Sequence, residues 1–317
     1  MDKVREWSHR IKNNVREVFF GNDEAVDKIL VALLCRGHVL IEDVPGVGKT
    51  VLARAVSACM GGEFRQIQCT PDLLPADVLG VSVFSPKTND FVFRPGPVVT
   101  NVLLVDEISR ATPRTQSALL EAMAEGQVSV EGRTTVLPDP FFLIATESPV
   151  DSEGTFPLPE VQKDRFFLSL SIGYPEVDAE REVMKSRKRK GDPVDTLSPV
   201  TDLDETKEMQ QELFSVHVAE QLRSYILQLV RFTRTDERLL IGVSPRGSLA
   251  LYKGAQAMAA LQGRTFVVPE DVQQIIVPVL RKRVLLKSEH AAKGVTEDDV
   301  IGDILTKAVV PPMQDAV

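Results

Sequence analysis

A glycine-containing loop that ends in Lys-Thr is the segment whose residue types point most directly to chemistry. Residues 39–50 read VLIEDVPGVGKT. Gly46 and Gly48 have no Cβ, so backbone N–H groups around them can close on phosphate oxygens. Lys49 can reach the β- and γ-phosphates of a nucleotide, and the Thr50 hydroxyl can bind Mg²⁺. The predicted nucleotide-binding residues are Pro45, Gly46, Val47, Gly48, Lys49, Thr50 and Val51.

One position departs from the pattern G-x-x-x-x-G-K-[ST]. Asp43 stands where the first glycine belongs. Asp tolerates unusual backbone angles better than most residues, so we expect the loop to form. The alternative is a glycine-rich turn that binds nothing. The flanking segments favour the loop, because an apolar run at 39–41 precedes it as a strand and an amphipathic run at 51–60 follows it as a helix.

Two carboxylates, Asp106 and Glu107, follow directly on a second apolar run at residues 102–105. A carboxylate at the C-terminal edge of a parallel strand, beside a phosphate loop, suits Mg²⁺ held through water. We therefore predict that Asp106 and Thr50 form the Mg²⁺ site and that Glu107 polarises the attacking water. The alternative is a pair of carboxylates that stabilises the dipole of the next helix.

The elements that must position these residues alternate between strand and helix. Runs at 102–105, 141–146 and 166–172 are mostly apolar without strict alternation, which is typical of strands covered on both faces. Segments 23–36 and 111–126 have apolar residues at helical spacing. The pattern predicts an α/β fold in which helices sandwich a mostly parallel sheet.

Two insertions interrupt this alternation. Residues 70–101 are rich in Pro and Gly and suggest a hairpin around Phe84. Residues 128–136 have the pattern of a β-hairpin, with Glu131 and Gly132 at the turn. We expect both to project from the α/β core.

Helical spacing dominates from about Leu203 onward. Residues 296–299, Thr-Glu-Asp-Asp, match a capping box with Asp in place of Glu, so a last helix should begin there. We predict two domains: an α/β nucleotide-binding core at residues 1–188 and a small all-helical lid at 189–317.

Composition narrows the class of protein. The chain has 317 residues, 43% of them hydrophobic, and a net charge of −8. That charge argues against nucleic acid as a partner. No apolar run is long enough for a membrane span, and residues 1–7 do not resemble a signal peptide, so we expect a cytoplasmic protein. The 3 cysteines and 4 histidines form no recognisable metal motif.

The chain resembles the AAA+ ATPases, and within them the MoxR family, along nearly its whole length. The resemblance includes a helix-2 insertion and a pre-sensor β-hairpin, which fall where the two insertions lie. The matching runs are EDVPGVGKT at 42–50, CTPDLLPAD at 69–77, FRPGP at 93–97, VDEISRA at 105–111, TQSALLEAM at 115–123, GTFPLPE at 154–160, DRF at 164–166, SPR at 244–246 and PEDV at 269–272.

The resemblance implies roles for two arginines. Arg165 looks like the arginine finger, supplied in trans to the ATP of a neighbouring subunit, where it would offset charge on the transferring phosphoryl group. Its alternative is a surface salt bridge with Asp164. Arg246 looks like sensor 2, projecting from the start of a helix capped by Ser244 to touch the γ-phosphate. Its alternative is a first-turn arginine that is only solvated.

Two serines depart from the family pattern. Ser148 stands where sensor 1 is usually Asn, and Ser109 replaces the Asn of the usual Asp-Glu-Ile-Asn-Arg. A serine hydroxyl is shorter than an amide and has fewer donors, so positioning of the water by sensor 1 is weakened. Glu147 and Thr146 are candidates to compensate.

The resemblance implies an ATP-hydrolysing, Mg²⁺-dependent ring ATPase that acts like a chaperone in the assembly or maturation of protein complexes. It further implies a homo-oligomer, expected to be a ring of six, a partner with a von Willebrand A (VWA) domain, and protein clients. The two serines leave open a nucleotide-gated assembly module with little turnover. A nucleic-acid motor is the third reading, and the acidic net charge weighs against it.

Overall fold

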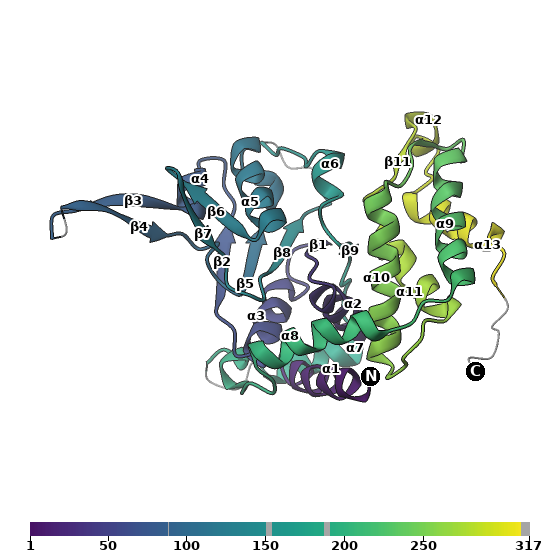
Figure 1. Ribbon diagram of the computed structural model, residues 1–317, viewed down its shortest axis with the longest axis horizontal. Helices are drawn as coiled ribbons and strands as arrows, with labels where there is room; N and C mark the ends of the chain where they lie inside the picture. Colours follow the sequence, from purple (N-terminus) through teal and green to yellow (C-terminus); the bar gives the residue numbers. More distant parts are fainter. Residues whose placement is uncertain (88, 150–153, 187–190, 312–317) are drawn as a thin grey trace.

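A parallel β-sheet is the centre of the N-terminal part of the molecule (Figure 1). The computed structural model describes residues 1–87, 89–149, 154–186 and 191–311. The sheet has 5 strands in the order β2-β5-β8-β1-β9, and all paired neighbours run parallel. Its strands are β1 (Val39–Glu42), β2 (Phe64–Gln68), β5 (Val102–Asp106), β8 (Phe142–Glu147) and β9 (Leu168–Leu170). The predicted α/β fold with a parallel sheet is confirmed.

Alternate residues of each central strand face opposite sides of the sheet, and helices cover both sides. In β5, Val102 and Leu104 join one apolar cluster, and Leu103 and Val105 join the other. The first cluster includes the buried faces of α1 (Asp2–Val15), α2 (Asp23–Leu34) and α3 (Lys49–Cys59). The second includes those of α4 (Pro75–Leu79) and α5 (Pro113–Glu125). Burial on both faces explains why these strands are apolar without alternation.

Both predicted insertions contain β-hairpins. The first pairs β3 (Gly80–Ser85) with β4 (Asp90–Pro95) and extends away from the rest of the molecule (Figure 1). The second pairs β6 (Gln127–Val130) with β7 (Arg133–Val136). Its turn uses Glu131 and Gly132, both with positive φ, as expected for a tight hairpin.

The C-terminal part is mainly helical and stands beside the α/β core (Figure 1). It also contains one short antiparallel pair, β10 (Leu239–Ile241) with β11 (Leu285–Leu286). The helices that follow β9 are α7 (Val177–Ser186), α8 (Leu203–Glu212), α9 (Glu220–Thr235), α10 (Pro245–Leu261), α11 (Pro269–Leu280), α12 (Ser288–Ala291) and α13 (Glu297–Lys307), with 3₁₀ turns η2 (Pro193–Thr196) and η3 (Leu213–Ser215). Within the core, the 3₁₀ turn η1 (Ile108–Arg110) follows β5, and the short helix α6 (Glu160–Lys163) precedes β9.

The predicted division into domains at residues 188 and 189 falls outside the described residues and stays a prediction. After that point, η2 contacts α3, and α8 contacts α1 and α2. Helices α9, α10, α11 and α13 pack against one another. None of the helices within the described residues is long and apolar enough to cross a membrane.

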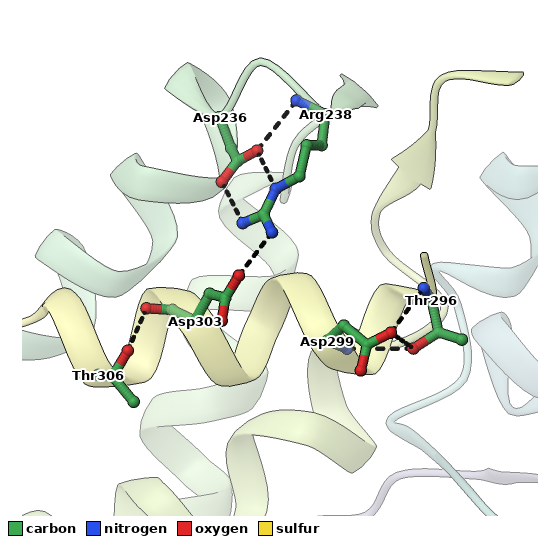
Figure 2. A network of polar contacts seen from close by, with 6 residues as sticks. All are labelled: Asp236, Arg238, Thr296, Asp299, Asp303 and Thr306. Carbon is green, nitrogen blue, oxygen red and sulfur yellow. Dashed lines mark hydrogen bonds and ion pairs between the residues drawn. The ribbon is translucent and has the colours of Figure 1, made fainter. Parts of the chain in front are cut away.

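A polar network fastens α13 to the turn between α9 and β10 (Figure 2). Arg238 bonds both carboxylate oxygens of Asp236, at 2.9 and 2.8 Å, and reaches Asp303 on α13 at 2.6 Å. The helix begins with the predicted capping box, in which Thr296 and Asp299 bond each other's backbone N–H groups. The network holds the last helix of the lid in place.

Candidate active site

The phosphate loop connects β1 to α3, as predicted. Gly46 and Gly48 adopt positive φ angles of 88° and 96°, which L-residues with a Cβ rarely adopt. A Cβ placed on Gly46 would meet no atom within 4 Å, so this position is open to a ligand. Lys49 lies at the start of α3, and its Nζ donates to the carbonyl oxygen of Asp43 at 2.8 Å. The loop is therefore a preformed cradle whose lysine is bonded to its own backbone.

Asp43 fits the loop for a reason other than the one we expected. Its φ is not positive, so tolerance of unusual backbone angles is not what makes Asp suitable here. The residue is only 6% exposed. Its carboxylate accepts hydrogen bonds from Val44 N and from three donors in residues 171–173. The position therefore needs an acceptor rather than a flexible backbone.

A cavity of about 350 Å³ adjoins the loop, and we call it the loop pocket. Its volume lies at the lower end of the range for small-molecule sites. The described residues that line it are mostly apolar and include no lysine or arginine. Those used below are Phe19, Gly46, Gly48, Val51, Ile172 and Tyr174.

Asp106 and Glu107 lie at the carboxyl end of β5, joined by the hydroxyl of Thr146 on β8. Thr146 Oγ1 donates to Asp106 Oδ1 at 2.5 Å and accepts from Glu107 N at 2.9 Å. Glu107 has φ 55° and ψ 54°, a left-handed conformation that is strained for a residue with a Cβ. The Glu107 carboxylate forms an ion pair with Arg110 at 3.0 Å. The strand end is therefore held in one arrangement, with the strain located at the predicted water-activating residue.

A second cavity of about 400 Å³, the polar pocket, lies at the carboxyl ends of β1, β5 and β8. Burial raises the pKa of the Glu147 carboxyl above its usual range, and Lys163 opposes that rise. The carboxyl groups of Glu42, Glu107 and Glu147 share this pocket with the cationic side chains of Arg110 and Lys163. Its charged and polar lining residues include Glu42, Glu107, Ser109, Arg110, Glu147, Ser148 and Lys163.

The two predicted arginines lie apart from both pockets. Arg165 is exposed and donates to the carbonyl of Leu120 at 3.1 Å. The expected alternative, a salt bridge to Asp164, is not formed: the Asp164 carboxylate instead accepts from Ser244 Oγ at 3.0 Å and from Arg283 Nε at 2.8 Å. Arg246 is exposed, two residues beyond Ser244 and close enough to Arg283 to act on it electrostatically. Neither arginine is among the described residues lining the loop pocket or the polar pocket.

The donor groups fit Mg²⁺ bound together with a nucleotide. Among the described residues, no cluster of three or more His, Cys, Asp and Glu side chains is arranged to hold a metal ion. Mg²⁺ at nucleotide sites needs only one or two protein oxygens, since phosphates and water supply the rest. Thr50 and Asp106 carry side-chain oxygens of the kind that Mg²⁺ prefers. The hydroxyl of Thr146, on β8, bonds to one of the two carboxylate oxygens of Asp106.

Sequence reasoning missed three participants in this site: the carboxylate acceptor of Asp43, the bridging hydroxyl of Thr146 and the Arg110 partner of Glu107. Only the role of the Asp43 carboxylate could have been predicted from the sequence. An acidic residue at a glycine position of a phosphate loop, directly after a buried strand, indicates a carboxylate that must find donors inside the fold.

Comparisons with known proteins agree with this geometry. The family described as "ATPase family associated with various cellular activities (AAA)" matches residues 38–168, and an AAA lid domain matches residues 231–304. The YeaC protein of Bacillus subtilis is 45% identical over 96% of this chain and 95% of its own length. Chaperone MoxR1 of Mycobacterium tuberculosis is 38% identical over 94% of this chain and 80% of its own length. A crystal structure from Cytophaga hutchinsonii superposes with a TM-score of 0.91 at 32% identity, covering 98% of both chains. This chain belongs to the MoxR family of AAA+ ATPases.

Proposed function

We propose that this ATPase-family chain binds ATP with Mg²⁺ at the phosphate loop and hydrolyses it. The observation that carries the proposal is the hydrogen-bonded unit of Asp106, Glu107 and Thr146 at the carboxyl edge of the same sheet that carries the loop. The loop side supplies a cradle for phosphates, and the strand ends supply a metal ligand and a base. Hydrolysis of a phosphoric anhydride needs these parts together.

Each residue has a distinct task in the proposed reaction. Lys49 and the N–H groups from Gly46 to Val51 bind and orient the phosphates. Thr50 and Asp106 hold Mg²⁺, which when bound offsets negative charge on the β- and γ-phosphates. Glu107 orients a water molecule and accepts its proton as the water attacks.

The remaining site residues complete the proposal around the γ-phosphate. Ser148 lines the polar pocket and takes the sensor 1 position. Arg165, and with it Arg246, stabilises charge on the transferring group. Since both arginines are exposed and neither lines the two pockets, we assign them to the site of a neighbouring copy, with Arg165 as the finger in trans.

We further propose that ATP turnover drives chaperone-like work on protein clients. The name of the relative Chaperone MoxR1 supports this role. The resemblance to the family supports a homo-oligomeric ring, expected to contain six subunits, and a partner with a VWA domain. The fold has helices and hairpins outside the site that are available for such contacts.

A steady-state ATPase assay with and without Mg²⁺ tests the proposal. We expect Lys49→Ala to abolish nucleotide binding and Glu107→Gln to retain binding while lowering turnover by about 10²-fold or more. Lys293→Ala, which removes an exposed lysine between α12 and α13, is the matched control and should behave as wild type. Wild-type protein without Mg²⁺-dependent turnover, or variants without effect, would exclude hydrolysis at this site.

A nucleotide-gated assembly module with slow turnover is the second candidate. The Glu107–Arg110 ion pair favours it, because that pair engages the carboxylate that should act on water. The Ser148 position favours it as well. Single-turnover kinetics separates the candidates: a fast chemical step excludes the gated module, and a chemical step as slow as in Glu107→Gln supports it.

A further inference from the structure

We propose that Asp43 is a positioning residue that holds the β9–α7 connection against the phosphate loop and thereby sets the affinity for the base side of the nucleotide. The inference rests on the proposed function, because it takes the loop pocket to be the nucleotide site. It assigns a role to a carboxylate that does not itself touch the phosphates.

One carboxylate oxygen of Asp43 gathers three donors from a segment about 130 residues away. Oδ2 accepts from Ser171 Oγ at 3.0 Å, from Ile172 N at 2.6 Å and from Gly173 N at 2.8 Å. Hydrogen bonds to a carboxylate are shorter and stronger than those between neutral groups. The segment directly after β9 is therefore fixed to the residue that directly follows β1.

The other polar atoms of Asp43 tie the same residue to the loop. Oδ1 accepts from Val44 N at 2.9 Å, and the carbonyl oxygen accepts from Lys49 Nζ at 2.8 Å. The Asp43 N–H donates to the carbonyl of Glu147 at 3.2 Å. Asp43 thus joins the loop, the end of β8 and the β9–α7 connection in one set of hydrogen bonds.

The segment that Asp43 holds is a wall of the loop pocket. Ile172, Gly173 and Tyr174 line it together with the loop residues Gly46 and Gly48. Ile172 is 5% exposed, so its N–H would lose its partner away from water if the carboxylate were removed. The segment would then move to satisfy that group.

The lining of the pocket indicates which part of a nucleotide this wall serves. Phe19, Val51 and Ile172 are apolar and suit the faces of a heterocyclic base, whereas phosphates bind the N–H groups of the loop. The Phe19 ring lies beside Gly48, because a Cβ placed on that glycine would be 3.3 Å from the ring. Displacement of the β9–α7 connection therefore weakens binding of the nucleoside more than binding of the phosphates.

Calorimetric titration of the full chain with two probes, Mg-ADP and Mg-tripolyphosphate, separates binding of the nucleoside from binding of the phosphates. The variant Asp43→Gly restores the glycine of the general loop pattern and removes the carboxylate. We expect its affinity for Mg-ADP to fall by about tenfold or more, while its affinity for Mg-tripolyphosphate stays within about twofold of wild type. Asp90→Gly, an exposed position in the β3–β4 hairpin, is the matched control and should change neither affinity.

Two results would overturn the proposal: unchanged Mg-ADP affinity in Asp43→Gly, or an equal fall for both probes, which would place the role of Asp43 in the loop itself. If Asp43→Gly does not fold, Ser171→Ala decides. That variant removes one of the three donors and should weaken Mg-ADP alone by about threefold, and no change would overturn the proposal. Failure of wild type to bind either probe would instead exclude the proposed function.

Discussion

The loop side and the arginine side of the proposed active site are held in different ways. On the loop side, the Asp43 carboxylate accepts from Ile172 N, and the Thr146 hydroxyl bonds to Asp106 and to Glu107 N. Asp43 and Thr146 are both buried. On the arginine side, Arg165 and Arg246 are exposed. The difference is that the loop side is held by hydrogen bonds within the chain, whereas the arginines of the other side face solvent, which fits the proposal that they serve a neighbouring copy.

The exposed arginines nevertheless rest on a rigid base. Arg283 is nearly buried, and it donates to Asp164 and to the carbonyl oxygens of Phe166 and Phe167. It thereby fixes the lid to the segment that carries Arg165. Because the backbone beneath Arg165 is already fixed, only its side-chain rotamers remain to be ordered when the guanidinium meets a phosphate.

The largest expected effect on turnover comes from variants that remove the loop side of the site in one subunit and the arginine side in another. Arg165→Ala and Glu107→Gln should each lower turnover by about 10³-fold, because each removes one half of every site. An equal mixture, allowed to exchange subunits, should recover turnover at about a quarter of the sites, where an intact loop side meets an intact arginine. Steady-state ATPase activity of the mixture measures this recovery.

Absence of recovery in a mixture that demonstrably exchanges subunits would mean that Arg165 serves its own chain, and the comparison between the two sides would lose its meaning. Arg223→Ala is the matched control for Arg165→Ala. It removes an exposed arginine of α9 whose ion pair is with Glu220 in the same helix.

A smaller effect should follow from loosening the loop side without removing a charge. Thr146→Val keeps the shape of the side chain and loses both bonds that join Asp106 to Glu107. We expect turnover to fall by about tenfold to hundredfold and the Mg²⁺ concentration for half-maximal turnover to rise. Thr146→Ser keeps the hydroxyl and should restore both parameters. If Thr146→Val shifts only thermal stability, the threonine is a packing residue and not a positioning one.

Arg246 provides a second test, because it is exposed like Arg165, and we predict that both serve a neighbouring site. Arg246→Ala should lower turnover by about tenfold, less than Arg165→Ala, because Arg246 lies in the first turn of α10 and, in the proposed role, reaches the γ-phosphate from the lid. The same mixing experiment with Glu107→Gln should give recovery. Recovery for Arg165→Ala without recovery for Arg246→Ala would place Arg246 over the loop of its own chain instead.

The contrast between the two sides also explains what could be predicted from sequence. The strand that ends in Asp106, the hairpin turn at Glu131–Gly132 and the cap at Thr296 are local patterns, and the structure confirms them. The bonds of Asp43 and Thr146 join residues 128–130 and 40 positions apart. Such bonds depend on how strands are ordered in the sheet, which no local pattern specifies. Exposure of the arginines likewise depends on where the lid docks.

The smallest expected effect concerns the lid network, which should matter for stability and not for chemistry (Figure 2). Hydrogen bonding to Arg238 lowers the pKa of the Asp236 carboxyl to about 2, from 3.8. Because the folded pKa is below the unfolded one, this contribution to stability is present above about pH 4 and is lost as the pH falls toward 2. Asp236→Asn should therefore cost about 2 kcal/mol of unfolding free energy at pH 7 and about half of that at pH 3.

Chemical denaturation at the two pH values measures the difference, and Asp303→Asn provides the control. Asp303 is 55% exposed and contacts Arg238 at a single atom, so its loss should change stability by less than about 1 kcal/mol. Neither variant should alter the affinity for Mg-ADP, because the network lies among α9, β10 and α13, none of which lines the loop pocket. A change in nucleotide affinity with Asp236→Asn would show that the stability of the lid and the loop side are coupled. Nucleotide binding on the loop side would then depend on the packing of the lid, which carries Arg246.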